Sequence, residues 1–535
     1  MLAPVISASV DTIRNPVLRG FNPDPSILRV GEDYFIATST FEWFPGVQIH
    51  HSRDLANWRL LSRPLDRLSQ LNMIGNPDSG GVWAPCLSYS DGLFYLTYSD
   101  IKSWKGNAYK IAYNYLVTAP SIEGPWSDPV FLNGSGFDPS IFHDDDGRKW
   151  FLNMLWDHRR LNERFAGIVL QELCPKTRRL VGPARNIFKG TDRGLVEGPH
   201  IYKRDGWYYL LTAEGGTEYA HACTLARSRR IEGPYEVHPD KHLVTSLGHP
   251  EAPLQKAGHG SLVQTQEGEW YLAHLCGRPI DGKHCPLGRE TAIQKCVWKE
   301  DGWLYLEHGS MLPVVETEGP IGIEPAPFNG EKWDGKFDSP ILDIHFQSLR
   351  QPVTDDWLSL TARPGFLRLK GMEPTISVFR QSLIARRVQA FDISVETTVE
   401  FQPTTFQQMA GLIAYYDTEN HYYLRISHDE TLGRTLNVIA TDAGHSCEAL
   451  MNDISIPDEG PVHLRMTMKG TDLQFGFSLG GDWQEFGPVL NGATLSDDYN
   501  HLGFTGAFVG LCCQDLSGQR LHADFERFVY CENPG

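Results

Sequence analysis

Hydrophobic and polar residues alternate in short runs along the chain, and no long stretch repeats apolar residues at the spacing of a helix. Turns containing Gly, Asp or Pro separate these runs, and Asp91-Gly92 and Asp205-Gly206 are typical of β-hairpins. Alternation with a period of two indicates a β-strand with one buried face. We therefore predict an all-β protein.

Five segments within the first 300 residues share one pattern: a turn, a small-x-apolar start, a hairpin with Gly or Asp, and an aromatic strand. They are DPSILRVGEDYFIATS from Asp24, APCLSYSDGLFYLTYS from Ala84, DPSIFHDDDGRKWFLNM from Asp138, GPHIYKRDGWYYLLTAE from Gly198 and HGSLVQTQEGEWYLAHL from His259. Their starts lie 60, 54, 60 and 61 residues apart. A nearly fixed period in an all-β chain indicates a propeller with one blade per repeat. We predict a five-bladed β-propeller over residues 1–318; the alternative is a β-sandwich with coincidentally similar turns.

In a propeller, the equivalent start of each innermost strand borders the central channel. Asp24, Asp138, Glu197 and His259 are therefore expected to become neighbours in space. An Asp in a turn is ordinary, because its side chain bonds nearby amides. Three carboxylates at equivalent places in a repeat indicate a chemical role.

The repeat fades after residue 310, and a proline-rich stretch that contains Pro313, Pro320, Pro325 and Pro327 is predicted to be a linker. Beyond it the strands alternate cleanly. In DISVETTVEF, Ile393, Val395, Val399 and Phe401 share one face. We predict a β-sandwich, of the jelly-roll or concanavalin-like kind, over residues 319–535.

Composition narrows the classes of partner and compartment. The chain has 535 residues, too many for one core, and a formal net charge of −18, which argues against nucleic acid or an anionic membrane as the main partner. No apolar run approaches the roughly 20 residues of a spanning helix, and the N-terminus has no signal-peptide pattern. The ten cysteines are dispersed without a C-x-x-C, which favours free thiols over a zinc site or disulfide framework. We expect a cytoplasmic protein.

Three acidic groups at one end of the central channel, the funnel of the propeller, suit glycoside hydrolysis. One carboxylic acid protonates the leaving oxygen, while one carboxylate activates water or attacks carbon. A third carboxylate is useful because a nearby like charge raises the pKa of the acid. PDSGG around Ser79 echoes a serine-protease motif, but Pro77 replaces the usual Gly and no His/Asp context supports it.

Other residues near the expected funnel have more than one interpretation. Phe41 and Trp83 either stack on a sugar ring or pack in the core. His259 is a satisfied polar residue, a metal ligand or a sugar contact. Arg289 binds sugar hydroxyls, holds a carboxylate ionised, or forms an ordinary surface ion pair.

The motifs NPDPS, VWAP, GFDPS, EGP and GHGS, in this order and spacing, resemble those of family 43 glycoside hydrolases. TSTFEWFPGVQIHHS, RETAIQK and FTGAFVGLCCQDLSG resemble the two-domain β-xylosidases of that family, in which a β-sandwich follows the propeller. The resemblance covers nearly the whole chain.

The resemblance implies roles for individual residues. Asp24 matches the general base, Glu197 the general acid, and Asp138 the group that tunes and orients the acid. The resemblance also implies that the anomeric configuration is inverted, and in inverting enzymes the base and acid carboxyls lie roughly 6.5–9.5 Å apart. The terminal sugar pocket is expected to be lined by Phe41, Trp83, Thr217 and Arg289, and closed by Phe504 or Phe508 from the sandwich.

The resemblance also implies an activity and partners. We expect an exo-acting, inverting β-1,4-xylosidase that releases xylose from the non-reducing end of short xylooligosaccharides. The alternatives are an α-L-arabinofuranosidase, a bifunctional enzyme and, more remotely, a non-catalytic sugar-binding propeller. The implied substrate is a small oligosaccharide, with no nucleic acid or membrane partner, and relatives imply a homo-oligomer, a dimer or a tetramer. No cofactor is expected to be required, although a divalent cation, Ca²⁺ or Mg²⁺, near His259 is left open.

Overall fold

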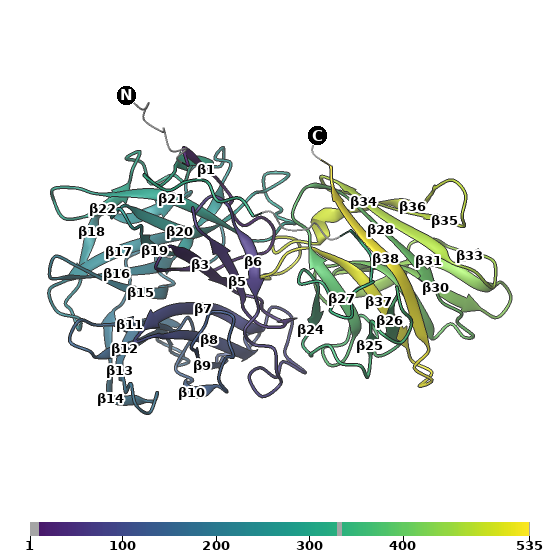
Figure 1. Cartoon of the computed structure of the whole chain (residues 1–535), viewed down its shortest axis with the longest axis horizontal. Helices are drawn as coiled ribbons and strands as arrows, with labels where there is room; N and C mark the ends of the chain where they lie inside the picture. The colour runs from purple at the N-terminus through teal and green to yellow at the C-terminus, as the bar shows by residue number, and fades with distance from the viewer. Residues whose placement is uncertain (1–9, 329–333, 534–535) are drawn as a thin grey trace, which may run out of the picture.

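The computed structural model describes residues 10–328 and 334–533, which form two β-rich lobes side by side (Figure 1). The N-terminal lobe is a five-bladed propeller and the C-terminal lobe is a sandwich, which confirms the predicted all-β fold. Within these two ranges the regular helical structure is one 3-10 turn, η1 (Gly492–Thr494). No helix in the described part of the chain is long and apolar enough to cross a membrane.

Each blade is a four-stranded antiparallel sheet. Blade 1 contains β2 (Ser26–Val30), β3 (Asp33–Thr38), β5 (Gln48–Ser52) and β6 (Arg59–Ser62). Blade 2 contains β7 (Gly81–Ser90), β8 (Leu93–Ser103), β9 (Ile111–Ala119) and β10 (Val130–Asn133). Blade 3 contains β11 (Ser140–His143), β12 (Lys149–Trp156), β13 (Phe165–Leu173) and β14 (Leu180–Phe188). Blade 4 contains β15 (Glu197–Arg204), β16 (Trp207–Glu214), β17 (Ala222–Ser228) and β18 (Glu236–Thr245), and blade 5 contains β19 (Gln255–Gln264), β20 (Trp270–Gly277), β21 (Glu290–Trp298) and β22 (Leu304–Leu306).

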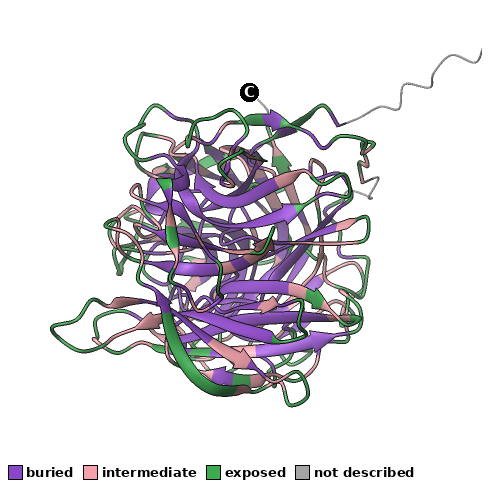
Figure 2. Cartoon of the chain, turned by 90° about the vertical axis from the view of Figure 1, so that its left-hand side faces the viewer, coloured by how far each residue is buried: buried purple, intermediate pink, exposed green. Residues whose placement is uncertain are grey.

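The innermost strands close a ring, because β19 of the last blade contacts β2 of the first. Serines at the third position of the repeat bind the blades together. Ser26 Oγ accepts the amide of Leu87 at 3.0 Å, and Ser261 Oγ accepts the amide of Ile27 at 2.8 Å. These bonds satisfy backbone groups that no strand pairs, at the narrow centre of the ring. Figure 2 shows buried strands inside this lobe and exposed loops at its periphery.

A short ladder joins the two ends of the propeller segment. β1 (Thr12–Arg14) pairs antiparallel with β23 (Glu316–Glu318). The predicted domain boundary between residues 318 and 319 falls directly after β23 and stays a prediction.

The C-terminal lobe consists of two sheets. The first contains, in spatial order, β32 (His445–Glu448), β31 (Gly433–Asp442), β30 (His421–Asp429), β29 (Gln408–Tyr415), β37 (Phe508–Asp515), β27 (Ser382–Arg387), β24 (Gln347–Leu349) and β4 (Trp43–Phe44), with β33 (Ile454–Ser455) beside β31. The second contains β25 (Leu358–Ser359), β26 (Leu367–Lys370), β38 (His522–Glu532), β28 (Asp392–Glu400), β34 (Val462–Lys469), β35 (Asp472–Ser478) and β36 (Gln484–Asn491).

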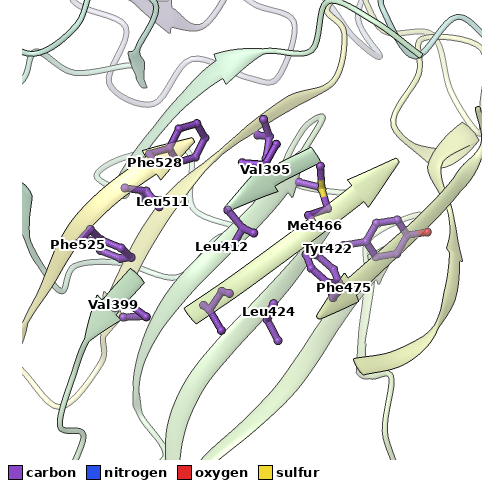
Figure 3. Packing of buried hydrophobic residues seen from close by; sticks show 14 of the residues in the cluster. Val395, Val399, Leu412, Tyr422, Leu424, Met466, Phe475, Leu511, Phe525 and Phe528 are labelled. Atoms are coloured by element: carbon purple, nitrogen blue, oxygen red, sulfur yellow. The ribbon is translucent and has the colours of Figure 1, made fainter. Parts of the chain in front are cut away.

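The sandwich core lies between these sheets. Val395 and Val399 of β28 point into it with Leu412 of β29 and Leu511 of β37 (Figure 3). The predicted inward face of residues 392–401 is confirmed, because Ile393, Val395, Val399 and Phe401 are all buried in this cluster. Period-two alternation therefore located this strand and its buried face correctly.

The two lobes share structure at their interface. β4 lies within the propeller sequence but pairs with β24 of the sandwich, on the side of that lobe that faces the propeller (Figure 1). A second hydrophobic cluster joins Trp43 and Phe21 of the propeller to Tyr415, Phe508 and Leu383 of the sandwich. The sandwich is therefore fixed against the propeller by backbone pairing and by a continuous core.

A buried ion pair crosses the same interface. Arg350, which follows β24, donates to the Asp78 carboxylate at 2.6 Å and to the carbonyl of Asn76 at 2.7 Å. Only 1% of the Arg350 side chain is exposed. Because removing one partner leaves the other charge buried and unpaired, breaking such a pair is costly.

We expect Arg350→Met to lower the free energy of unfolding by about 3–5 kcal/mol, measured by urea denaturation. Arg520→Met is the control, since the pair that Arg520 forms with Asp356 is exposed. Its expected cost is below about 1 kcal/mol. Equal losses for the two variants would contradict a stabilising role for the interface pair.

Candidate active site

The five repeat starts share an unusual backbone conformation. The φ angles are 55° at Asp24, 35° at Ala84, 57° at Asp138, 57° at Gly198 and 42° at His259. This left-handed region is open to Gly and is tolerated by Asp better than by most residues. Asp24 and Asp138 thus fit the local backbone at these positions. The local backbone explains why Asp is tolerated there, and only their shared cavity points to a role in chemistry.

A cavity of about 470 Å³ lies at these repeat starts. Nine residues predicted from the sequence line it: Asp24, Phe41, Trp83, Asp138, Glu197, Thr217, His259, Arg289 and Phe504. Sequence reasoning missed others in the lining, among them Trp104, Lys110, Phe137, Phe165, Leu195 and Leu502. Leu502 and Phe504 come from the sandwich sequence, so both domains build the cavity.

Asp24 is held as a carboxylate. Oδ1 accepts Arg289 Nη1 at 3.0 Å, and Oδ2 accepts the Ser39 hydroxyl at 2.7 Å. Burial by itself would raise the pKa of Asp24, but Arg289, then His259, the Ser39 bond and His221 outweigh burial and lower that pKa below its ordinary value. Arg289 is itself buried, so of its three interpretations the structure favours the one that holds a carboxylate ionised.

Glu197 has the opposite environment. Burial first, and then the negative charge of Asp24, raise its pKa to about 8, although Arg289 and Lys110 oppose the shift. Glu197 therefore keeps its proton near neutral pH. An ionised Asp24 and a protonated Glu197 in one cavity have the protonation states of a base and an acid.

Asp138 is hydrogen-bonded to the backbone beside Glu197. Its Oδ2 accepts the amide of Gly198, the residue after Glu197, at 2.9 Å. Burial, followed by the charges of Glu197 and Asp24, raises the pKa of Asp138 well above its ordinary value. The pKa of Asp24 is lowered while the pKa values of Asp138 and Glu197 are raised, so Asp24 is the carboxyl of the trio best suited to be ionised.

Aromatic rings form one wall of the cavity. The Phe504 ring centroid lies 5.9 Å from Phe41, 5.2 Å from Trp83 and 4.8 Å from Trp104. Arg289 Nη2 donates to the carbonyl of Phe504 at 2.9 Å, so the group that holds Asp24 also holds this loop.

Phe508, the other candidate for this wall, lies outside the cavity lining. Its ring stacks on Trp43 with centroids 3.8 Å apart and planes 12° apart, and it is fully buried in the interface core. Phe508 begins β37, and its pairing with Tyr415 of β29 directs it into that core. The structure therefore places Phe504 at the wall of the cavity and Phe508 in the interface core.

Lys110 is the missed residue with the clearest electrostatic effect. Its Nζ lies 4.6 Å from the Trp156 ring and 5.6 Å from the Trp83 ring. Burial lowers the pKa of Lys110 to about 8, an effect that the charge of Glu197 opposes. Lys110 stands just before β9 and outside the repeat starts, so no sequence pattern marks it.

The donor set around His259 does not fit a protein-built metal cage. The described residues contain no group of three or more His, Cys, Asp or Glu side chains that could hold a metal ion. His259 Nδ1 lies 3.7 Å from Asp24 Oδ1, and the two oxygens of Asp24 already accept hydrogen bonds from Arg289 and Ser39.

Known proteins resemble this chain over nearly its whole length. The description "Glycosyl hydrolases family 43" matches residues 13–304, and "Beta xylosidase C-terminal Concanavalin A-like domain" matches residues 335–531. Xylosidase/arabinosidase 43B of Humicola insolens is 53% identical, over 97% of this chain and 97% of its own length. A beta-xylosidase of Bacillus subtilis (strain 168) is 53% identical, over 97% of this chain and 99% of its own. The crystal structure of a xylan beta-1,4-xylosidase from Bacillus halodurans C-125 superposes with a TM-score of 0.96 at 57% identity, over 97% of this chain and 100% of that one.

Proposed function

This chain belongs to glycosyl hydrolases family 43, and from that premise we propose that it is an exo-acting, inverting β-1,4-xylosidase of short xylooligosaccharides. Membership confirms the predicted class, a glycoside hydrolase. The observation that carries the proposal is the pairing of an ionised Asp24 with a protonated Glu197 in one buried pocket. The names of the relatives, β-xylosidases among them, support xylose as the released sugar.

The proposed reaction is a single displacement. Asp24 removes a proton from a water molecule as that water attacks the anomeric carbon, and Glu197 gives its proton to the departing glycosidic oxygen. The C–O bond of water forms while the glycosidic C–O bond breaks. Asp138 orients Glu197 through the amide of Gly198. Exchange with solvent then returns the proton from Asp24 to Glu197.

The walls of the pocket support the proposal of exo-action. Phe41 and Trp83 come from the propeller and Phe504 from the sandwich, and together with the carboxyls they line one cavity of about 470 Å³. A pocket closed by two domains suits the end of a sugar chain better than its middle. We therefore propose release of one xylose at a time from the non-reducing end.

The second candidate is α-L-arabinofuranosidase activity in the same pocket. Its support is the name of the Humicola insolens relative, a xylosidase/arabinosidase. The ratio of kcat/KM on aryl β-xyloside and aryl α-L-arabinofuranoside ranks the two activities. A non-catalytic sugar-binding propeller does not require the opposed protonation states of Asp24 and Glu197.

The function is tested by proton NMR of the turnover of xylobiose and of an aryl β-xyloside, recorded from the first minutes. Xylobiose shows whether xylose is released, and the anomer is read from the aryl xyloside, because the reducing-end xylose of xylobiose already carries both anomers. Appearance of α-xylose before mutarotation is the expected result, because inversion of a β-linkage gives the α-anomer. Initial β-xylose would mean retention and would make Asp24 a nucleophile. Absence of xylose, with rapid hydrolysis of an arabinofuranoside, would transfer the proposal to the second candidate.

The pH profile gives a separate prediction. Because Glu197 acts only while protonated and its pKa is raised to about 8, kcat/KM should fall as pH rises through about 8. On the acid side it should fall only below the ordinary range of Asp, where Asp24 takes up a proton. Lys110→Met removes a positive charge that lowers the pKa of Glu197, so the alkaline limb should move to higher pH. A limb that stays in place or moves down would contradict the assignment of Glu197.

Three further properties are proposed. A cytoplasmic location is supported by the ten free thiols, of which Cys447 and Cys531 are exposed. A dimer or tetramer is proposed from the resemblance and is tested by light scattering of the purified protein. A divalent cation near His259 would be held through water rather than by a cage of side chains, and it is tested by comparing kcat before and after chelation.

A further inference from the structure

The PDSGG segment, residues 77–81, has a structural role that its sequence does not reveal. It lies at the entry to β7, beside the aromatic wall, and Asp78 and Ser79 are 9% and 2% exposed. Ser79 has a φ of 56°, a strained value for a residue with a side chain. Such strain is retained where the surrounding contacts fix the conformation.

The turn holds three rings of the pocket. The carbonyl of Asp78 accepts Trp104 Nε1 at 3.0 Å, and the carbonyl of Ser79 accepts Trp83 Nε1 at 2.9 Å. The Ser79 hydroxyl accepts the backbone amide of Phe504 at 3.0 Å, across 425 positions of sequence. All three rings line the cavity of the proposed active site.

The turn is itself fixed from both domains. The Asp78 carboxylate binds Arg350 at 2.6 Å and accepts the amide of Thr418 at 3.3 Å, and both residues belong to the sandwich. On the propeller side, the Ser79 amide donates to Glu42 Oε2 at 3.1 Å. A Cβ at Gly81 would lie 2.3 Å from the carbonyl of Phe41, so this part of the turn has no room to shift.

We propose that Ser79 is a positioning residue for glycoside hydrolysis, whose hydroxyl fixes Phe504, the sandwich's part of the pocket wall, in register with Trp83 and Trp104. The inference rests on the proposed function for its kinetic consequence. Its geometry is independent of which sugar is cleaved. Through Asp78, the same turn links docking of the sandwich to the shape of the pocket.

The test is Ser79→Ala, which removes the hydroxyl and keeps the two carbonyls that hold the tryptophans. The amide of Phe504 loses its partner, and loss of this part-buried hydrogen bond corresponds to about a tenfold fall in kcat/KM. We expect most of this loss to come from a rise in KM, with kcat nearly unchanged, because the wall contacts substrate and the carboxyls are untouched. It is measured with aryl β-xyloside or aryl α-L-arabinofuranoside, whichever the parent enzyme cleaves faster.

Ser52→Ala is the matched control. Ser52 is also buried, and its hydroxyl accepts the amides of Asp54 and Leu55 at 3.1 and 2.9 Å, outside the cavity lining. Its removal should lower the melting temperature by a similar amount and leave kcat/KM within about twofold of the parent. A similar kinetic loss in both variants would overturn a positioning role for Ser79.

A double-mutant cycle separates positioning from a general effect on folding. In a Phe504→Ala background, Ser79→Ala should have little further effect on kcat/KM, because the ring that it positions is gone. An undiminished effect in that background would overturn the proposal. A crystal structure of Ser79→Ala gives a readout without activity: a displaced Phe504 is expected, and an unmoved Phe504 would overturn the proposal. If the parent proves inactive on both sugars, the proposed function fails while the crystallographic readout still decides the role of Ser79.

Discussion

Asp24→Ala is expected to lower kcat by about 10⁴-fold on both xylobiose and an aryl β-xyloside. Water must be deprotonated whatever group departs, so a good leaving group cannot replace the base. Asp24 is the one carboxyl of the trio whose pKa lies below its ordinary value, because Arg289, His259 and the Ser39 bond outweigh burial. The other two carboxyls of the trio, Asp138 and Glu197, have raised pKa values and are poorly suited to take its place as a base.

Two further variants sharpen this result. Asp24→Asn keeps a hydrogen-bond partner for Arg289 and should show the same kinetic loss, which separates loss of the base from loss of a buried charge pair. Asp144→Asn is the control, because Asp144 is a buried carboxylate bound by Lys203 and Tyr208 outside the cavity lining. It should change stability and leave kcat nearly unchanged.

Added azide, a nucleophile that needs no base, should restore turnover of the aryl xyloside by Asp24→Ala. Retained activity of Asp24→Ala on the aryl xyloside would remove Asp24 from the role of base.

The propeller was predictable because its information is local. Each blade is specified by hairpins such as the one at Asp205-Gly206 and by a repeat of about 60 residues, and ring closure then brings the repeat starts together. Asp24 and Asp138 were visible for the same reason. The sandwich strand at residues 392–401 was predictable from period two alone.

The remaining parts of the site depend on contacts that sequence spacing does not encode. Arg289 reaches Asp24 across 265 positions, and Ser79 reaches Phe504 across 425. Phe504 and Phe508 are four residues apart in one motif, and pairing of β37 in the sheet is what separates a wall residue from a core residue. Lys110 has neither a repeat position nor a motif, and its effect on Glu197 arises only after the blades assemble.

Glu197→Ala should give a pattern that Asp24→Ala does not. The loss is expected to be about 10³-fold or more on xylobiose, whose departing sugar alkoxide requires a proton, and about tenfold or less on an aryl xyloside with an acidic phenol. The physical reason is that a good leaving group departs as a stable anion, so the acid contributes little to its transition state. The measurement is kcat/KM across a series of aryl xylosides of rising phenol pKa.

For the parent enzyme, the logarithm of kcat/KM should depend weakly on the pKa of the leaving phenol, and for Glu197→Ala it should fall steeply. The alkaline limb near pH 8 should also vanish from the variant, because the group whose pKa is raised to about 8 is gone. A flat dependence together with a retained limb would assign the proton donor to another group, and Asp138, whose pKa is also raised, would be the next to test. The two variants together thus distinguish base from acid: equal losses on both substrates identify the base, and losses that grow with leaving-group pKa identify the acid.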